Sequence, residues 1–275
     1  MNKISTLGPR GTFSDAATMN YMQRADERSE PVYFRSIKSA LCAIGEECDL
    51  GVIPVENFSE GYVSIVLDHL VAAPLIILGE IYQSVKFSFI SKEKDLAAIN
   101  QLYAQFVAKG QCVDFIASLG EINVINTDSN IYSLEMLRDN SHGCGAIVPA
   151  GSFDPADYPT VIEDVGDFSD NQTRFLVLGN ADQYPQVSHA AEKTSIIILD
   201  HNDYAGLLCE VLKPMAKRGI NLTSIVSRPT RKMFGKYYIF IDFIGSLADL
   251  KVQEALAEMR KISTVKLLGS YRKIY

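Results

Sequence analysis

The chain lacks several features that would assign it at once to a class of protein. It has no apolar run near the ~20 residues that a membrane span needs. Residues 1–4 lead directly into a strand pattern, with no signal peptide. The five cysteines are scattered, with no CxxC pair and no histidine at ligand spacing. These absences predict a cytoplasmic protein with reduced thiols, no metal and no organic cofactor.

A basic segment is also missing, and the formal net charge is −7. This balance argues against nucleic acid or an anionic membrane as a partner. An acidic protein can bind a small anion only through local donors, such as helix N-termini and single arginines. Those are the places to look for a binding site.

Short apolar runs alternate with helical patterns in the first two thirds of the chain. The pattern predicts strands at residues 4–7, 49–55, 122–125, 145–148 and 173–178, with extended crossings between lobes at 74–82 and 84–90. It predicts helices at 13–24, 99–109 and 129–137. A further helix should follow the loop 56–61 and end at residue 70. This alternation favours an α/β fold with a mostly parallel sheet covered by helices.

A polar seam at residues 179–193 separates this part from a different pattern. The pattern beyond it predicts strands at 194–199, 221–227, 236–243 and 265–270, with helices at 206–217 and 248–261. Gly219 stands where the first of these helices should end. The order βαββαβ is the ferredoxin-like split unit.

Three segments of the first part, residues 8–12, 56–61 and 126–129, each follow a strand and open a helix. Such junctions lie at the carboxyl edge of a parallel sheet, where ligands of open α/β folds bind. The unpaired amides of a helix start also attract carboxylates. Thr12, Ser59 and Thr127 can alternatively act only as helix caps. Together the three junctions predict a carboxylate-binding cleft, but they name no substrate.

A fourth segment, residues 170–175, enters an apolar strand from an acidic loop. It carries Thr173 and Arg174 at the mouth of the strand. By itself this segment is equally typical of an ordinary exposed strand edge.

The order and spacing of several motifs resemble those of the prephenate dehydratase family over nearly the whole chain. Residues 8–14 (GPRGTFS) resemble the family's GPxGTFS, residues 52–61 (VIPVENFSEG) its VPIENSxEG, and residues 171–175 (NQTRF) its NxTRF. Residues 206–208 stand at its GAL motif. Residues 219–223 (GINLT) and 226–229 (VSRP) are similar to the GINLT and ESRP segments of its phenylalanine-binding ACT domain.

The resemblance implies a domain organisation. It implies an α/β protein with a two-lobed, periplasmic-binding-protein-like catalytic domain over residues 1–182. One lobe would cover about residues 1–80 and 160–182, and the other about 81–159. A ferredoxin-like ACT domain would follow over residues 190–275.

The resemblance also implies an activity. Prephenate would lose carbon dioxide and its ring hydroxyl to give phenylpyruvate, a step of L-phenylalanine biosynthesis. The protein would be a cytoplasmic carbon–oxygen lyase without metal or cofactor, inhibited by phenylalanine and assembled as a homodimer or homotetramer.

The site residues follow from the matched motifs. The catalytic residue would be Thr173, the threonine of TRF, which would assist the departure of hydroxide. The expected substrate-binding residues are Thr12, Glu56, Asn57, Thr127, Arg174 and Phe175. The expected allosteric residues are Gly206, Leu207, Leu208, Asn221, Ser227, Arg228 and Pro229.

The chain departs from the family at several of these positions. Phe58 replaces the serine of ENS, Asn126 the serine before Thr127, and Val226 the glutamate of ESRP, while Leu207 replaces the alanine of GAL. Residues 105–112, starting at Gln105, keep little of HPQALAQC beyond its QC end. Phe58 would add bulk to the cleft, which predicts a different ring acid or poor use of prephenate.

Two alternatives to the dehydratase stay open. One is a decarboxylase that keeps the ring hydroxyl, and the other is a non-catalytic sensor of carboxylates or amino acids. The retained Thr173 favours the dehydratase over both.

Overall fold

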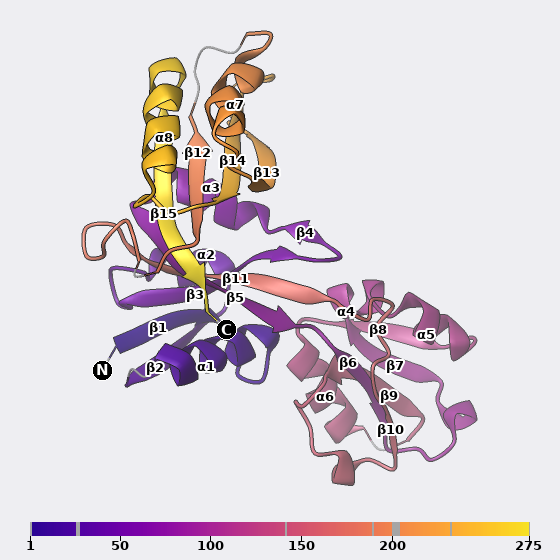
Figure 1. The fold of residues 1–275 in the computed structure, drawn as a ribbon. Helices are drawn as coiled ribbons and strands as arrows, with labels where there is room; N and C mark the ends of the chain where they lie inside the picture. Colours follow the sequence, from indigo (N-terminus) through magenta and orange to yellow (C-terminus); the bar gives the residue numbers. More distant parts are fainter. Residues whose placement is uncertain are drawn as a thin grey trace.

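The computed structural model describes residues 2–25, 28–140, 142–188, 190–199, 204–231 and 233–274. Two lobes lie side by side, and a third unit containing the C-terminal elements sits on the first lobe (Figure 1). Within the described ranges, no helix has the length and apolar content that a membrane crossing requires.

The first lobe is built on a mixed sheet with helices on both faces. Its elements are β1 (Asn2–Leu7), β2 (Ser29–Phe34), β3 (Leu50–Asn57), β4 (Gly61–Tyr62), β5 (Leu75–Ser84), β11 (Gln172–Asn180), α1 (Phe13–Ala25), α2 (Ile37–Cys42) and α3 (Ser64–Ala72). Strands β2 and β3 run parallel to β1, and β11 lies antiparallel between β3 and β5. The late strand β11 thereby returns the chain to the centre of the first lobe.

Strand β11 has side chains in two separate cores, because successive side chains of a strand point to opposite faces. Phe175 and Val177 pack on the α1 side, with Ile4 of β1. Leu176 and Leu178 pack on the α2 and α3 side. The sheet therefore separates two environments, and each residue of β11 belongs to one of them.

The second lobe is a smaller five-stranded sheet in the order β10-β6-β9-β7-β8. Its elements are β6 (Phe87–Ser91), β7 (Gln101–Gln105), β8 (Asn123–Thr127), β9 (Cys144–Pro149), β10 (Thr160–Ile162), α4 (Phe106–Gly110), α5 (Val113–Ser118) and α6 (Asn130–Asp139). Because β10 pairs with β6, this sheet extends to Ile162.

The prediction of one helix over residues 99–109 is wrong for its first half. Residues Gln101–Gln105 form β7, which pairs in parallel with both β8 and β9. Leu102, Tyr103 and Ala104 are all buried there. A short continuous apolar run fits a strand buried on both faces as well as a buried helix, so periodicity cannot separate the two. The expectation of a mostly parallel sheet is also too simple, since both lobes contain antiparallel pairs.

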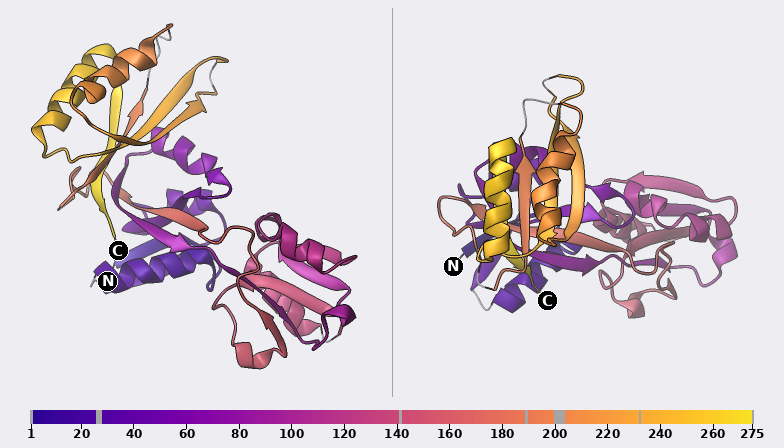
Figure 2. Two further views of the ribbon diagram at one scale, coloured as in Figure 1. Left: turned by 45° about the vertical axis from the view of Figure 1, so that its right-hand side comes forward. Right: turned by 45° about the horizontal axis from the view of Figure 1, so that its top comes forward.

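The C-terminal unit confirms the predicted βαββαβ order. Its elements are β12 (Lys193–Ile198), α7 (Leu207–Lys217), β13 (Leu222–Pro229), β14 (Tyr237–Ile244), α8 (Leu250–Ile262) and β15 (Val265–Lys273). Both helices pack on one face of the sheet β13-β14-β12-β15, over a core that includes Ile196, Ile241 and Phe243. Figure 2 shows α7 and α8 side by side on the outer face of this sheet.

The sheet of the C-terminal unit continues into the sheet of the first lobe. The end of β15 pairs in parallel with β5, with Arg272 opposite Gly79. The approach is close at Gly269, whose φ is +142° and where a Cβ atom would lie 2.4 Å from the carbonyl oxygen of Ile77. Only glycine fits such a position without strain. The predicted seam at residues 179–193 thus begins in β11 and ends in β12, and the two units share one continuous sheet through β15 and β5.

The inner face of the C-terminal sheet joins the core of the first lobe. Ile197, Phe240 and Leu268 from the sheet pack in one cluster with Leu67 and Leu70 of α3. The two units are therefore joined by a backbone ladder and by a shared apolar core.

Candidate active site

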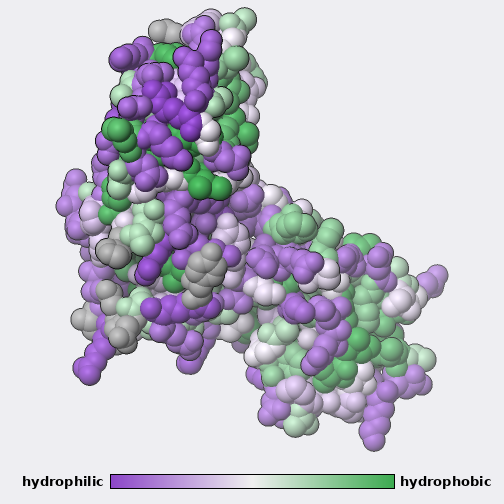
Figure 3. All heavy atoms as spheres, viewed as in Figure 1, coloured by the Kyte–Doolittle hydropathy of each residue, from purple (hydrophilic) through white to green (hydrophobic). Residues whose placement is uncertain are grey.

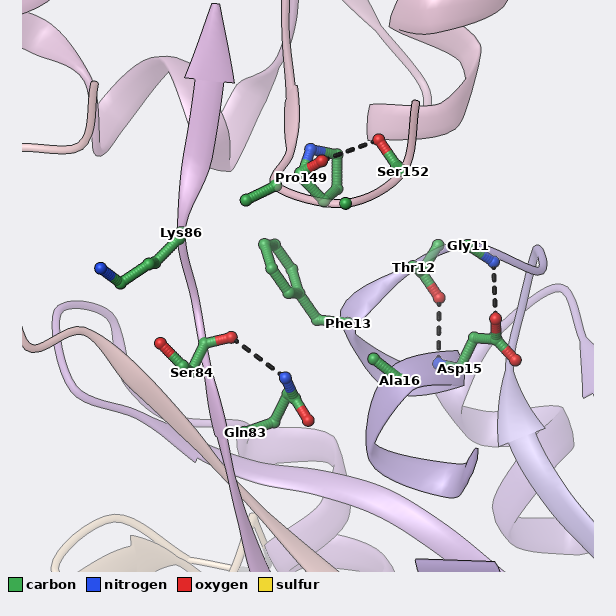
Figure 4. A pocket seen from close by; sticks show the side chains of 12 residues that line it. Gly11, Thr12, Phe13, Asp15, Ala16, Gln83, Ser84, Lys86, Pro149 and Ser152 are labelled. Atoms are coloured by element: carbon green, nitrogen blue, oxygen red, sulfur yellow. Dashed lines mark hydrogen bonds between the residues drawn. The ribbon is translucent and has the colours of Figure 1, made fainter. Parts of the chain in front are cut away.

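A cavity of about 360 Å³ lies between the two lobes. Its lining comes from the start of α1, the end of β5 and the segment after β9, as Figure 4 shows. The lining residues are Gly11, Thr12, Phe13, Asp15, Ala16, Gln83, Ser84, Lys86, Pro149, Ala150, Gly151 and Ser152. Its size and position suit a small ligand held between the lobes.

The start of α1 forms one wall of this cavity. The Thr12 hydroxyl accepts a hydrogen bond from the backbone N–H of Asp15 at 3.3 Å and so caps the helix. Gly11 has a φ of +87°, and a Cβ atom there would lie 3.0 Å from Ile131 of α6 in the other lobe. Glycine therefore fits both the turn and the close approach of the lobes. The positive end of the helix dipole faces the cavity, and the carboxylate of Asp15, which also lines it, accepts a hydrogen bond from the N–H of Gly11 at 2.8 Å.

Thr173 does not itself line this cavity, but it lies in the middle of three paired strands, next to a residue that does. It lies opposite Asn57 of β3 on one side and Gln83 of β5 on the other. Directly opposed residues share one face of a sheet, and Gln83 lines the cavity. The TRF threonine therefore shares a sheet face with Asn57 of the second junction and with Gln83 of the cavity lining.

The orientation of the Asn57 amide follows from its neighbours. Its Oδ1 accepts hydrogen bonds from the backbone N–H groups of Ser59 (3.0 Å) and Glu60 (3.1 Å). Backbone N–H groups can only donate, so Nδ2 must point the other way. There it donates to Oγ1 of Thr173 at 2.9 Å. Among the described residues, no hydrogen bond uses the Thr173 hydroxyl as a donor, so its hydrogen is available to a ligand.

Two buried amides that the sequence reasoning missed complete this network. Asn171 donates to Oε1 of Gln111 at 2.8 Å, and Gln111 Nε2 lies 3.4 Å from Oδ1 of Asn57. Both side chains are only 2% exposed. Gln111 belongs to the second lobe and so links the two lobes at Asn57. The available signal was their place in matched motifs, Asn171 in NxTRF and Gln111 in the retained QC.

Lys86 is a second residue that the sequence did not single out. Of the twelve residues that line the cavity, all of them described, it alone carries a positive charge. Its Nζ lies 3.2 Å from a carboxylate oxygen of Asp164, and both side chains are about half exposed. In Figure 4 the amine extends away from Phe13. Exposed ion pairs of this kind are weak, so a ligand carboxylate can replace Asp164.

Arg174 does not reach the cavity, contrary to the expectation that it binds substrate. Strand alternation places it on the opposite face from Thr173, where its side chain is 6% exposed. Its guanidinium bonds Glu80 (2.7 Å), Asp242 (2.7 Å) and Tyr271 (3.0 Å). Burial lowers the pKa of Arg174, but anionic neighbours, led by Asp242, outweigh it and hold the pKa well above its ordinary value.

Three other positions also lie outside the cavity. Phe175 is 1% exposed and packs in the core beneath α1, so it has no surface for a ligand. Glu56 lies opposite Arg174, 3.6 Å from its guanidinium. Phe58, expected to fill the cleft, is 70% exposed. Phe58 and Glu56 line a separate pocket together with Asn57, Tyr82 and Arg174.

Thr127, at the end of β8, is occupied within its own lobe. Its hydroxyl bonds the carbonyl of Ser129 (3.1 Å) and the hydroxyl of Ser133 (2.7 Å). Ser129 in turn caps α6 by accepting from the N–H of Tyr132. The third junction is therefore a capped helix start. This agrees with the alternative that its polar side chains serve only the helix end.

The expected allosteric residues are spread over the C-terminal unit. Gly206, with φ +97°, precedes α7. Leu207 is buried in the core, whereas Leu208 is 39% exposed. The carbonyl of Asn221 accepts from the N–H of Ile244. The side chain of Leu207 is therefore part of the core of the C-terminal unit.

The last of these residues lie on the edge strand β13. Ser227 and Pro229 are exposed there. Between them, Arg228 forms a forked ion pair with Asp68 of α3, at 3.0 Å and 3.1 Å from Nη2 to the two carboxylate oxygens. A ligand can use Arg228 only by sharing it with Asp68 or displacing Asp68.

Fold and site together define a two-lobed, periplasmic-binding-protein-like α/β protein with a ferredoxin-like C-terminal unit and a cavity between its lobes. Residues 4–183 match the family described as prephenate dehydratase, and residues 195–260 the one described as ACT domain. The chain belongs to the prephenate dehydratase family.

Individual relatives agree with this assignment. The prephenate dehydratase of Amycolatopsis methanolica is 32% identical over 287 residues, covering 99% of this chain and 89% of that protein. The structure of the Arthrobacter aurescens prephenate dehydratase in complex with L-Phe superposes with a TM-score of 0.84 at 29% identity, covering 99% of this chain and 90% of that one.

A third relative limits what the fold alone can show. GqqA, described as a quorum-quenching acylase, has a TM-score of 0.82 at 22% identity and covers 98% of each chain. At that identity the likeness concerns the fold only. The activity is therefore assigned from the family and the site, because one fold hosts several reactions.

Proposed function

We propose that this chain is a carbon–oxygen lyase that converts prephenate to phenylpyruvate, with Thr173 as the residue that assists loss of the ring hydroxyl. The bond from the ring to its carboxylate breaks and releases carbon dioxide. Its electron pair enters the ring as the carbon–oxygen bond breaks, and the departing hydroxide takes up a proton and leaves as water. Aromatisation of the ring drives both events.

The observation that carries this proposal is the hydrogen-bond direction at Thr173. Asn57 donates to Oγ1 of Thr173 at 2.9 Å, which supports donation of the hydroxyl hydrogen to the departing oxygen. An aliphatic hydroxyl is a weak acid. Positioning and electrostatic stabilisation must therefore supply most of the rate.

The two substrate carboxylates need positive partners, and Arg174 is not available to them. We assign this role to the start of α1, with Thr12, and to Lys86. Glu56 and Phe175 then have structural roles, one beside Arg174 and one in the core. Thr127 supports the start of α6.

For the C-terminal unit we propose an amino-acid-binding ACT domain with L-phenylalanine as its ligand. The bound L-Phe of the Arthrobacter aurescens relative supports this, as do the GINLT and SRP segments. We expect weaker binding than in typical members, because Leu207 is buried in the core and Arg228 is already paired with Asp68. Calorimetric titration decides it: binding heat supports the proposal, and no heat with millimolar ligand contradicts it.

The same unit is the expected assembly surface. Several apolar side chains are exposed there. Ile225 lies on β13, Met233 and Phe234 lie on the turn that follows it, and Tyr237 and Ile244 lie on β14. Figure 3 shows apolar residues at the surface of this unit. We propose a homodimer or homotetramer formed through it, which light scattering of the purified chain will distinguish from a monomer. We also propose a cytoplasmic location, where thiols such as the five free cysteines stay reduced.

The test of the catalytic proposal compares two changes at one position. Thr173→Ala removes the hydroxyl and should lower kcat by a factor on the order of 10² with the fold intact. Thr173→Ser keeps the hydroxyl and should retain most of the activity. Equal turnover of prephenate by the alanine variant and the parent would refute the role of Thr173.

A further inference from the structure

Thr173 and Arg174 are consecutive residues of β11 with opposite surroundings. Thr173 belongs to a network of amides and hydroxyls, whereas Arg174 lies in an ion cluster that reaches into the C-terminal domain. In this cluster Arg174 bonds Glu80 of β5, Asp242 of β14 and Tyr271 of β15. Two of its three closest partners therefore come from the other domain.

The donor directions in this cluster form a closed loop. Arg174 can only donate, so Asp242 and Tyr271 accept from it. Ser195 of β12 donates to Oδ1 of Asp242 and lies 2.6 Å from the Tyr271 oxygen. The Ser195 hydroxyl has one hydrogen, and Asp242 receives it. In the second hydrogen bond the Tyr271 hydroxyl must therefore donate to Ser195. Every group is satisfied, and such buried networks have few alternative arrangements.

Burial and charge make the loop rigid. The side chains of Arg174 and Glu80 are each 6% exposed, and that of Asp242 is 13% exposed. Lys193 of β12 adds a second cation, 2.9 Å from Glu80. Moving any one partner would leave a buried charge without its counterpart, which is strongly unfavourable.

The backbone of β11 is irregular at two places, and one of them lies beside Arg174. Its register with β3 shifts between Arg174 and Phe175, and the strand begins at Gln172, one residue before Thr173. Near a strand end and a register shift, fewer ladder hydrogen bonds fix the backbone. The buried side chain of Arg174, the next residue, is therefore a further anchor for Thr173, in addition to the direct hydrogen bond from Asn57.

We propose that Asp242 and Tyr271 of the C-terminal domain are positioning residues for Thr173, acting through Arg174. The domain proposed to sense an amino acid thus holds the strand that carries the proposed catalytic hydroxyl. Any shift of β14 or β15 moves Arg174 and alters the geometry at Thr173. The inference rests on the role of Thr173 given above.

The test uses Asp242→Asn in the full chain. Asparagine matches aspartate in size but offers only one oxygen to two donors, so the loop cannot close. We expect kcat to fall on the order of tenfold, as small misplacements of reacting groups do, while KM stays nearly unchanged. Tyr271→Phe, which keeps the ring, should act in the same direction with a smaller loss. Glu258→Gln breaks an ion pair with Arg218 on the outer helices and should leave kcat unchanged.

A double variant separates positioning from general damage. If Asp242 acts through Thr173, then Asp242→Asn should not lower the residual rate of Thr173→Ala any further. The same tenfold loss in that background, or no loss in the single variant, would overturn the proposal.

Hydrogen exchange provides a readout that does not depend on turnover. Asp242→Asn should speed exchange in peptides spanning residues 172–175, and Glu258→Gln should not. If the parent fails to convert prephenate, the proposed function is wrong, and exchange still tests the positioning. Unchanged exchange in Asp242→Asn would overturn the positioning alone.

Discussion

The two sides of strand β11 differ in the kind of interactions that hold them. On one side, Thr173 lies in a network of amides and hydroxyls with Asn57 and Asn171, and Gln111 at the end of this network also lies 3.4 Å from the carboxylate of Glu60. On the other side, Arg174 lies among buried charges from two domains. Neutral groups suit a site that must receive an anion and release hydroxide, whereas paired charges suit a permanent junction.

The comparison also shows that a continuous motif need not form a continuous site. Thr173 bonds Asn57, Arg174 lies at the domain junction and Phe175 lies in the core beneath α1. Conclusions about one residue of TRF therefore do not transfer to its neighbours. The following changes test this division, from the largest expected effect to the smallest.

Arg174→Ala should have the largest effect, and on stability. Removing the cation leaves Glu80 and Asp242 buried without it, which costs about 3–5 kcal/mol of unfolding free energy in comparable pairs. Urea denaturation measures the loss. Arg218→Ala, on the surface of the C-terminal helices, is the matched control and should lose much less. Similar losses in the two variants would show that the cluster is no stronger than a surface pair.

Asn57→Asp should affect turnover more than stability. A carboxylate cannot donate to Oγ1 of Thr173, so the threonine hydroxyl would donate to it instead of to the substrate. We expect kcat to fall by about 10²-fold, the usual loss for a group that acts in the transition state. Asn123→Asp, at an exposed site of β8, makes the same chemical change and should be neutral. A normal kcat for Asn57→Asp would remove the argument from hydrogen-bond direction.

Phe58→Ser should change little. The side chain is 70% exposed and lies outside the cavity between the lobes, so restoring the family's serine gives no new contact there. We expect kcat/KM for prephenate to stay within about twofold of the parent, as for most surface changes. A large gain would show that Phe58 enters the cleft when substrate binds.

The smallest effect concerns His69 on α3, on the charged side of the sheet. Burial, followed by Lys38 and Lys266, lowers the pKa of His69 below 6.5. The unfolded chain then binds a proton that the folded chain does not, so this residue costs stability as pH falls below about 6.5. His69→Asn should therefore reduce the loss of stability between pH 7 and pH 5. Urea midpoints at the two pH values measure it, and parallel curves would contradict it.

Much of the fold could be predicted from the sequence. The βαββαβ order could be predicted because the spacing of apolar residues differs between its helices and its strands, and because Gly219 marks the end of the first helix. Strand β7 was missed because a continuously apolar run has no period. The pairing of β15 with β5 could not be predicted, since it joins residues far apart in the sequence. Gly269 is the residue whose type reflects this close approach.

The site could be predicted in part. Thr12 lines the cavity and Asn57 pairs with Thr173, whereas Thr127 of the third junction is occupied within its own lobe. Arg174 was placed with the substrate because its partners, Asp242 and Tyr271, lie in the other domain and no local pattern reveals them. Lys86 gave no signal because a single lysine outside a motif resembles any surface lysine.

Product analysis tests the central claim most directly. The purified full chain is incubated with prephenate, and phenylpyruvate is followed by its absorbance and identified by mass. The account predicts phenylpyruvate, formed with loss of both carbon dioxide and the ring oxygen, and formed far more slowly by Thr173→Ala. A product that keeps the ring oxygen, or no turnover by the folded parent, would contradict it.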